Sequence, residues 1–228
     1  MAKTTNPPAK TPTPPPAPAP EGEARWLVWY HRNQKVLSYA ILALAIIAVG
    51  GWLWRETGRR KAAAANAALH DAQARMENGD IASASTDFQR IIRTYPGTDA
   101  AYQAELGSNA IRVASGQGQI AVDALRKFVG SNPPAYYAAG AWAMLGAALE
   151  DAKKFDEAAI AYKQSSDLAP EPYRKVDGLL GASRAYRLAG KNDQSLALLR
   201  DILGKFPKET PGVAEATVRL AVATQGRM

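Results

Sequence analysis

A proline recurs every 37 residues in the later part of this chain, at Pro96, Pro133, Pro170 and Pro207, and the residues before each proline recur with it. A fixed period of this length is typical of an array of similar supersecondary units. Proline lacks an amide hydrogen and clashes with the preceding helical turn, so each proline is expected to mark the end of a helix. The sequence therefore predicts a repeat protein.

Other positions repeat in phase with the prolines. A small residue is followed four residues later by a large apolar residue, a spacing that places both on one face of a helix. The small residues are Ala84, Ala121, Ala158 and Ser195, and the large ones are Phe88, Leu125, Tyr162 and Leu199. Each of these segments follows a turn signal, such as Gly79-Asp80, which itself follows a second helical pattern. Each unit is thus predicted to be a helix, a tight turn, a helix and a proline stop.

The third unit carries the fullest pattern, in the order Trp142, Leu145-Gly146, the turn at Lys153, Ala158, Tyr162 and Pro170. It resembles the tetratricopeptide repeat (TPR), whose signature has these residue types in this order. We expect small residues at Gly146 and Ala158 because the two helices of a hairpin cross closely there. Any alanine-rich array of helical hairpins is an alternative, but no segment alternates with the period of two that a sheet requires.

The expected fold is therefore all-α. We predict an α-solenoid of about four TPR-like hairpins over residues 62–228, and the run after Pro207 should form a capping helix that covers the last repeat. The first unit is the least complete match to the pattern.

The segment from Val36 to Trp54 is apolar, without charge and 19 residues long. Such a helix spans about 28 Å, close to the hydrocarbon core of a bilayer. Tryptophans and a tyrosine flank it, as is typical of membrane interfaces. We predict a single transmembrane helix. A cleaved secretory signal and a buried core helix are the alternatives, although a signal is usually shorter and closer to the N-terminus.

The remaining N-terminal residues divide into three predicted parts. Residues 1–24 are rich in proline and alanine and should be a disordered tail, which either is simply solvated or is bound by a PxxP-reading partner. Residues 25–35 form a basic, aromatic membrane flank, and residues 55–61 a basic linker. The absence of cysteine excludes disulfides and lipid attachment through cysteine.

The net charge of +7 does not indicate nucleic-acid binding, because residues 1–61 carry +6 of it and the repeats are nearly neutral. The basic residues surround the membrane segment, where they meet anionic lipid headgroups. Lysine and arginine are almost equally frequent on its two sides, so charge alone leaves the topology undecided.

The sequence offers few residues that could carry out catalysis. His31 and His70 are the two histidines, and without cysteine a zinc site is not expected. The acidic pairs Glu150-Asp151 and Asp156-Glu157 are expected to be solvated and to form local ion pairs with Lys153 and its neighbour. We predict no catalytic residue, cofactor, metal or small-molecule substrate, and hence no enzyme.

TPR-like arrays commonly bind a peptide or a partner's helix in a groove lined by the first helices of successive units. The candidate residues for such a protein-binding groove are Tyr102, Arg112, Tyr136, Tyr173, Arg184 and Arg187. The alternative for each is an exposed arginine or a tyrosine that packs between helices.

From about Glu23 onward, the order of basic aromatic flank, one membrane helix and small TPR domain resembles the YfgM-type TPR membrane proteins of bacteria, ancillary subunits of the SecYEG translocon. The resemblance implies a single-pass protein of the inner membrane, with its N-terminus in the cytoplasm and its TPR domain in the periplasm. It also implies protein partners among translocon subunits, periplasmic chaperones and exported chains. The Pro-rich tail departs from the short acidic N-terminus of that family.

A structural accessory subunit of another membrane complex is an alternative, in which Gly50 and Gly51 would be the contact point between membrane helices. Replacing both with leucine should then dissociate the complex. A regulatory domain tethered to a soluble enzyme is a further alternative, which the missing catalytic residues disfavour.

Overall fold

The computed structural model describes residues 21–224, which contain nine α-helices and no strand. This confirms the predicted all-α fold. The chain divides into two units, Met1–Thr57 and Gly58–Met228. The helices are α1 (Glu21–Glu77), α2 (Ile81–Thr94), α3 (Asp99–Ala114), α4 (Gly118–Gly130), α5 (Ala135–Asp151), α6 (Phe155–Leu168), α7 (Pro172–Leu188), α8 (Asn192–Lys205) and α9 (Val213–Ala223).

Within the described residues, α1 is the one helix that is long and apolar enough to cross a membrane. Its most apolar 18-residue window has a mean hydropathy of 2.2, and 0% of that window is buried. A helix from the core of this chain would be buried, so the core-helix alternative is disfavoured. Length and composition do not distinguish a membrane anchor from a secretory signal.

Two predicted boundaries differ from the structure. The helix α1 begins at Glu21, so residues 21–24 are helical and do not belong to a disordered tail; residues 1–20 of that tail lie outside the described range. The predicted linker, residues 55–61, is also helical. Both differences have one reason: no proline occurs between residues 21 and 95, and extending an existing helix is far easier than starting a new one.

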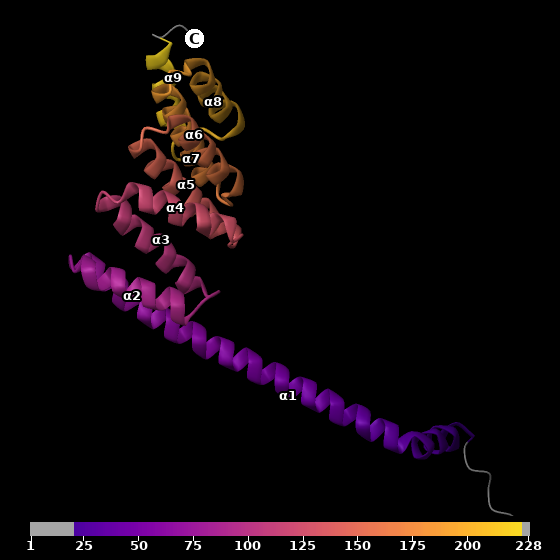
Figure 1. The fold of residues 1–228 in the computed structure, drawn as a ribbon. Coiled ribbons are helices and arrows are strands. Elements are labelled where there is room, and N and C mark those ends of the chain that lie inside the picture. The colour runs from indigo at the N-terminus through magenta and orange to yellow at the C-terminus, as the bar shows by residue number, and fades with distance from the viewer. Residues whose placement is uncertain (1–20, 225–228) are drawn as a thin grey trace, which may run out of the picture. The chain divides into compact units, whose positions relative to one another are not determined.

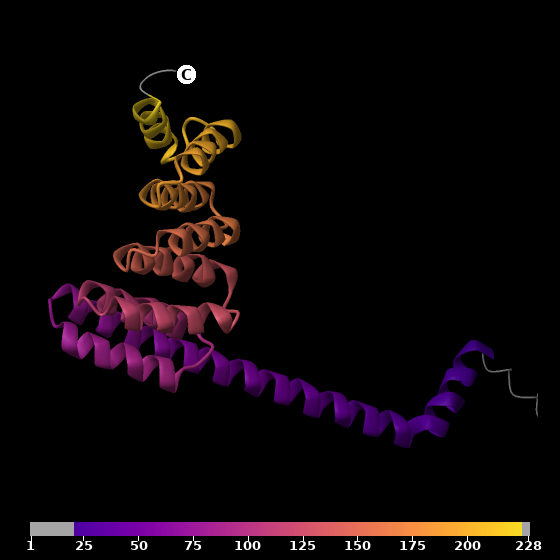
Figure 2. The same ribbon diagram turned by 45° about the horizontal axis from the view of Figure 1, so that its top comes forward.

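The second unit is a stack of helical hairpins. From α3 onward, the colours in Figures 1 and 2 show that the hairpins follow one another along the stack in chain order. Three hairpins are formed by α3 with α4, α5 with α6, and α7 with α8, while the end of α1 packs with α2. The helix α9 packs on α8 as the predicted cap, and the side chains of Val213, Ala216 and Leu220 are buried there.

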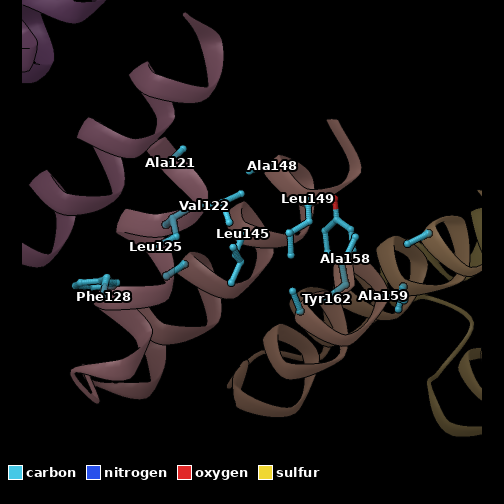
Figure 3. Close-up of a cluster of buried hydrophobic side chains, with 14 of the residues drawn as sticks. Ala121, Val122, Leu125, Phe128, Leu145, Ala148, Leu149, Ala158, Ala159 and Tyr162 are labelled. Atoms are coloured by element: carbon cyan, nitrogen blue, oxygen red, sulfur yellow. The ribbon is translucent and has the colours of Figure 1, made fainter. Parts of the chain in front are cut away.

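The core consists of the in-phase positions on the second helices. Ala84, Ala121, Ala158 and Ser195 are all buried, and so are the large residues four positions later. Figure 3 shows the central cluster, in which side chains of α4, α5 and α6 meet. The first helix of each hairpin contributes the facing residues, such as Leu145 and Leu149. Burial of this stripe on each helix is what holds a hairpin together.

All four hairpin turns have the same hydrogen-bond pattern. The residues at positions 79, 116, 153 and 190 have positive φ, and three of them are glycine. At the third turn, Lys153 N–H donates to the Glu150 carbonyl (2.8 Å) and Lys154 N–H donates to the Leu149 carbonyl (2.8 Å). These two bonds define a Schellman motif, which closes the C-terminus of a helix and favours glycine at the left-handed residue. Lys153, with φ of 59°, is the exception to glycine.

This exception leads to a stability prediction. Lys153→Gly should raise the free energy of unfolding by roughly 0.5–1 kcal/mol, because glycine adopts the left-handed conformation without a clash of its Cβ. Thermal and urea unfolding of the full chain in detergent, followed by circular dichroism, would measure the change. Ala152→Gly, at the adjacent residue with φ of −76°, is the control and should not stabilise the protein. Equal or lower stability of Lys153→Gly would contradict this account of the turn.

Candidate functional site

The ring of Tyr162 lies where α5, α6 and α7 meet. A Cβ added to Gly146 of α5 would lie 2.8 Å from the ring atom Cδ1, and one added to Gly181 of α7 would lie 2.7 Å from the same atom. Side chains do not approach so closely, so both positions require glycine while the ring is present. The tyrosine therefore packs its α6 helix against the first helix of its own hairpin and against the first helix of the next.

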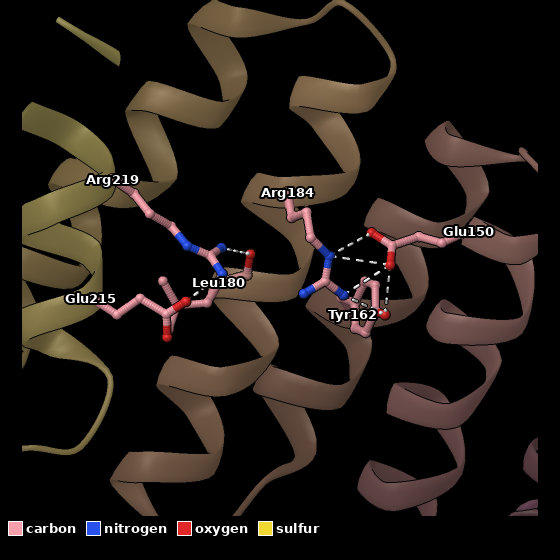
Figure 4. Close-up of polar contacts among 6 residues, drawn as sticks. All are labelled: Glu150, Tyr162, Leu180, Arg184, Glu215 and Arg219. Carbon is pink, nitrogen blue, oxygen red and sulfur yellow. Dashed lines mark hydrogen bonds and ion pairs between the residues drawn. The ribbon is translucent and has the colours of Figure 1, made fainter. Parts of the chain in front are cut away.

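The hydroxyl of Tyr162 belongs to a polar network with Glu150 of α5 and Arg184 of α7, drawn in Figure 4. Arg184 donates from Nε to Oε1 of Glu150 (3.1 Å) and from Nη2 to Oε2 (2.8 Å), a bidentate pair. Tyr162 Oη donates to Glu150 Oε2 (3.2 Å) and accepts from Arg184 Nη2 (3.0 Å). The network connects two hairpins at residues 34 positions apart.

Burial, followed by the nearby Glu150 carboxylate, raises the pKa of Tyr162 to about 12. The hydrogen bond to Glu150 is the first cause of the raised pKa of Arg184. Both shifts favour a neutral phenol and a charged guanidinium, which are the forms that this geometry requires.

The ion pairs correct one part of a sequence-based expectation. Asp151, Asp156 and Glu157 are exposed, as expected, but the acids do not pair locally, and three of them have partners on other hairpins. Glu150 pairs with Arg184, Glu157 with Arg126 of α4, and Asp156 with Lys191 at the start of α8 (2.8 Å). The reason is the stacking itself, which brings residues about one repeat apart side by side on neighbouring hairpins.

The six candidate groove residues have different surroundings. Arg184 is held by Glu150 and Tyr162, and Arg112 donates from Nη1 to Oδ1 of Asn109 (2.8 Å) within α3. Arg187 is exposed, and its guanidinium has no hydrogen bond or ion pair within residues 21–224. The structure therefore does not bring the three arginines together in one cluster with the tyrosines.

Two of the candidate tyrosines, Tyr102 and Tyr136, in contrast belong to one cluster at the starts of the first helices. Tyr102 of α3 stacks on Tyr137 of α5 with a centroid distance of 5.2 Å, and Tyr137 meets Tyr136 edge to face. The guanidinium of Arg174 of α7 lies over the Tyr136 ring, 4.6 Å from its centroid. Tyr136 and Tyr173 are 52% and 44% exposed, so both remain available to a ligand. Aromatic and arginine side chains in such a cluster are typical of protein interfaces.

Next to this cluster the first helices approach closely. A Cβ on Gly140 of α5 would lie 3.4 Å from Leu106 of α3 and 3.6 Å from Nη2 of Arg174 of α7. Sequence reasoning missed Tyr137, Arg174, Gly140 and Gly181 as parts of these contacts. The adjacent pairs Tyr136-Tyr137 and Tyr173-Arg174 were visible signals, but their contacts depend on how the hairpins stack.

The described residues hold no group of three or more metal-ligating side chains. What the arrangement provides instead is a surface: aromatic rings and one arginine at the ends of stacked first helices. This is the class of a helical-repeat scaffold that binds other proteins.

Comparison with known proteins places the chain within that class. The model of the tetratricopeptide repeat-like domain family matches residues 28–171, and that of the tetratricopeptide repeat matches residues 177–209. The chain belongs to the tetratricopeptide repeat-like domain family. A search of curated proteins found no match.

Solved structures with a similar fold include MamA, with 18% sequence identity and a TM-score of 0.54 over 68% of this chain and 84% of MamA. A putative kinesin light chain of Podosopora anserina with nearly identical TPR-like repeats has 17% identity and a TM-score of 0.56, over 71% of this chain and 85% of the other. At such identities the likeness concerns the fold alone.

The packing of Tyr162 leads to a second prediction. Gly181→Ala should lower the free energy of unfolding by about 1–3 kcal/mol, because its Cβ would clash with the ring. Gly204→Ala is the matched control: no atom lies within 4 Å of the added Cβ on α8, so it should be neutral or stabilising. Urea unfolding of both variants measures the difference. Equal effects of the two substitutions would contradict the close crossing at Gly181.

The raised pKa of Tyr162 leads to a third prediction. Because the pKa is higher in the folded protein than the ordinary value of 10.0, the folded state holds the proton more tightly, and stability should fall as the pH rises from 10 to 12. Tyr162→Phe should cost about 1 kcal/mol at pH 8, where the hydroxyl bonds are intact. Between pH 10 and 12 the difference in the free energy of unfolding between Tyr162→Phe and the unmodified protein should shrink. A difference that stays constant over this range would refute the assignment.

Proposed function

We propose that this protein is a membrane-anchored adaptor whose TPR domain lies in the periplasm and helps to pass exported chains from the Sec translocon to chaperones. The observation that carries the proposal is the exposed apolar stretch of α1, which precedes a protein-binding repeat domain in the same chain. An anchor followed directly by a binding domain keeps that domain close to the membrane surface, where exported chains emerge.

The proposal agrees with the chemistry of the repeat unit. The tyrosine cluster with Arg174 can bind protein side chains. The basic residues beside the apolar stretch suit contact with anionic lipid headgroups. The layout of anchor and TPR domain is the one that the YfgM-type resemblance implies.

Topology is the fourth prediction. Two fusions at Met228, one to a reporter active only in the periplasm and one to a protein fluorescent only in the cytoplasm, should give activity with the first alone. The matched control is a pair of fusions to residue 33, before the apolar stretch, which should give the opposite result. A cytoplasmic C-terminus would overturn the translocon proposal.

A further inference from the structure

A pocket with a volume of about 390 Å³ opens between α7, α8 and α9. We call it the α9 pocket. It is lined by Ser183, Arg184, Arg187, Ser195, Leu199, Val218, Arg219, Val222 and Ala223. None of these residues belongs to the tyrosine cluster described above, so the pocket is a separate feature of the repeat unit.

The repeat register explains why this pocket exists. Leu199 occupies the position of Tyr162 one repeat later, and Ser183 and Val218 occupy the positions of Gly146 and Gly181. One repeat earlier, the ring of Tyr162 fills the space between Gly146 and Gly181. Here side chains occupy both glycine positions, so the arrangement around Tyr162 is not repeated, and the pocket opens beside Leu199 between α7 and α9.

The same alignment of the repeats places a positive charge in the α9 pocket where the preceding repeat has a negative one. The equivalent of Glu150, whose carboxylate accepts a hydrogen bond from the Tyr162 hydroxyl, is Arg187. A ring in the α9 pocket would therefore face a guanidinium where Tyr162 faces a carboxylate. A guanidinium binds a carboxylate in preference to a neutral donor.

The other two arginines of the pocket already have partners, as Figure 4 shows. Arg184 is bound to Glu150, and Arg219 donates to the Leu180 carbonyl (3.1 Å) and pairs with Glu215. Within the described part of the chain, the guanidinium of Arg187 has no hydrogen-bond or ion-pair partner. It is thus the guanidinium left for an incoming anion.

The pocket also exposes apolar surface. Val218 and Val222 of α9 are 62% and 74% exposed, whereas the equivalents of Val222 in the two preceding hairpins, Ala185 and Ala148, are completely buried. An apolar face that is covered in earlier repeats and open here is typical of a binding surface.

We propose that the α9 pocket binds an aromatic side chain of a partner protein that has an acidic residue next to it in sequence. The ring packs on the exposed side chains of Val218 and Val222, and the carboxylate pairs with Arg187. This inference rests on the proposed adaptor function and specifies the chemistry of the partner segment.

The test uses the full-length protein in lipid nanodiscs and three amidated pentapeptides that carry fluorescein at the N-terminus. Ala-Glu-Tyr-Glu-Ala should bind, while Ala-Glu-Ala-Glu-Ala, without a ring, and Ala-Lys-Tyr-Lys-Ala, of opposite charge, should bind about tenfold more weakly or not at all. Fluorescence anisotropy measures each affinity. Equal binding of the three peptides would overturn the proposal.

Three variants locate the site. Arg187→Glu should weaken binding of Ala-Glu-Tyr-Glu-Ala about tenfold, whereas Arg200→Glu, with the same charge change on α8 outside the pocket, should not. Leu199→Tyr fills the pocket from within and should abolish binding. If Leu199→Tyr does not fold, as judged by circular dichroism, the comparison of peptide binding by Arg187→Glu and Arg200→Glu tests the site. Equal effects of the two charge reversals would place the peptide elsewhere and refute the site.

A second copy of this chain is the competing occupant, and sedimentation distinguishes it. A dimer that Arg187→Glu converts to a monomer would overturn the proposal for a partner protein, and a monomer throughout supports it. A failure of the α9 pocket proposal can be told apart from a failure of the proposed adaptor function, because the topology fusions test the latter independently of the pocket.

Discussion

The close crossing of helices around the Tyr162 ring is the constraint on which the stacking of the repeat unit depends. One ring contacts the glycines of two first helices, Gly146 in its own hairpin and Gly181 in the next. Its hydroxyl lies between the carboxylate and the guanidinium that connect the same two helices. Packing and polar contacts thus coincide at one residue, and that residue sets how far apart neighbouring hairpins lie. Because each hairpin contacts mainly its neighbours, such crossings determine the surface that the array presents.

Periodicity alone predicted much of the fold. Prolines, small residues and large residues in phase located the second helices, and the turn signals located the four hairpin turns, because these features are local to each unit. Lys153 could be assigned the backbone conformation of a glycine only through its register with Gly79, Gly116 and Gly190. Contacts between units were beyond this reasoning. The Glu150–Arg184 pair and the stacking of Tyr102 on Tyr137 join residues more than thirty positions apart, and they depend on the angle and distance of helix packing.

The candidate binding residues were predicted only in part, for the same reason. A pattern predicts that Tyr136 and Arg184 lie on first helices, but it does not predict which one remains available. In the structure Arg184 is hydrogen-bonded to Glu150. Tyr136 remains exposed, although the guanidinium of Arg174 lies over its ring. The likeness to solved structures at 17–18% identity concerns the fold alone, so the partner has to be inferred from positions where the repeats differ. The exchange of tyrosine for leucine at position 199, together with arginine in place of glutamate at position 187, is such a difference.

The central claim is that the repeat unit works while attached to a membrane by the apolar part of α1. The most direct measurement is alkaline extraction of membranes from cells that produce the chain, followed by the intact mass of the protein. A membrane anchor predicts that the chain stays with the pelleted membranes at the full mass of 24.4 kDa. Release into the supernatant, or a shortened chain that has lost the apolar segment, would contradict the account and identify the segment as a cleaved secretory signal.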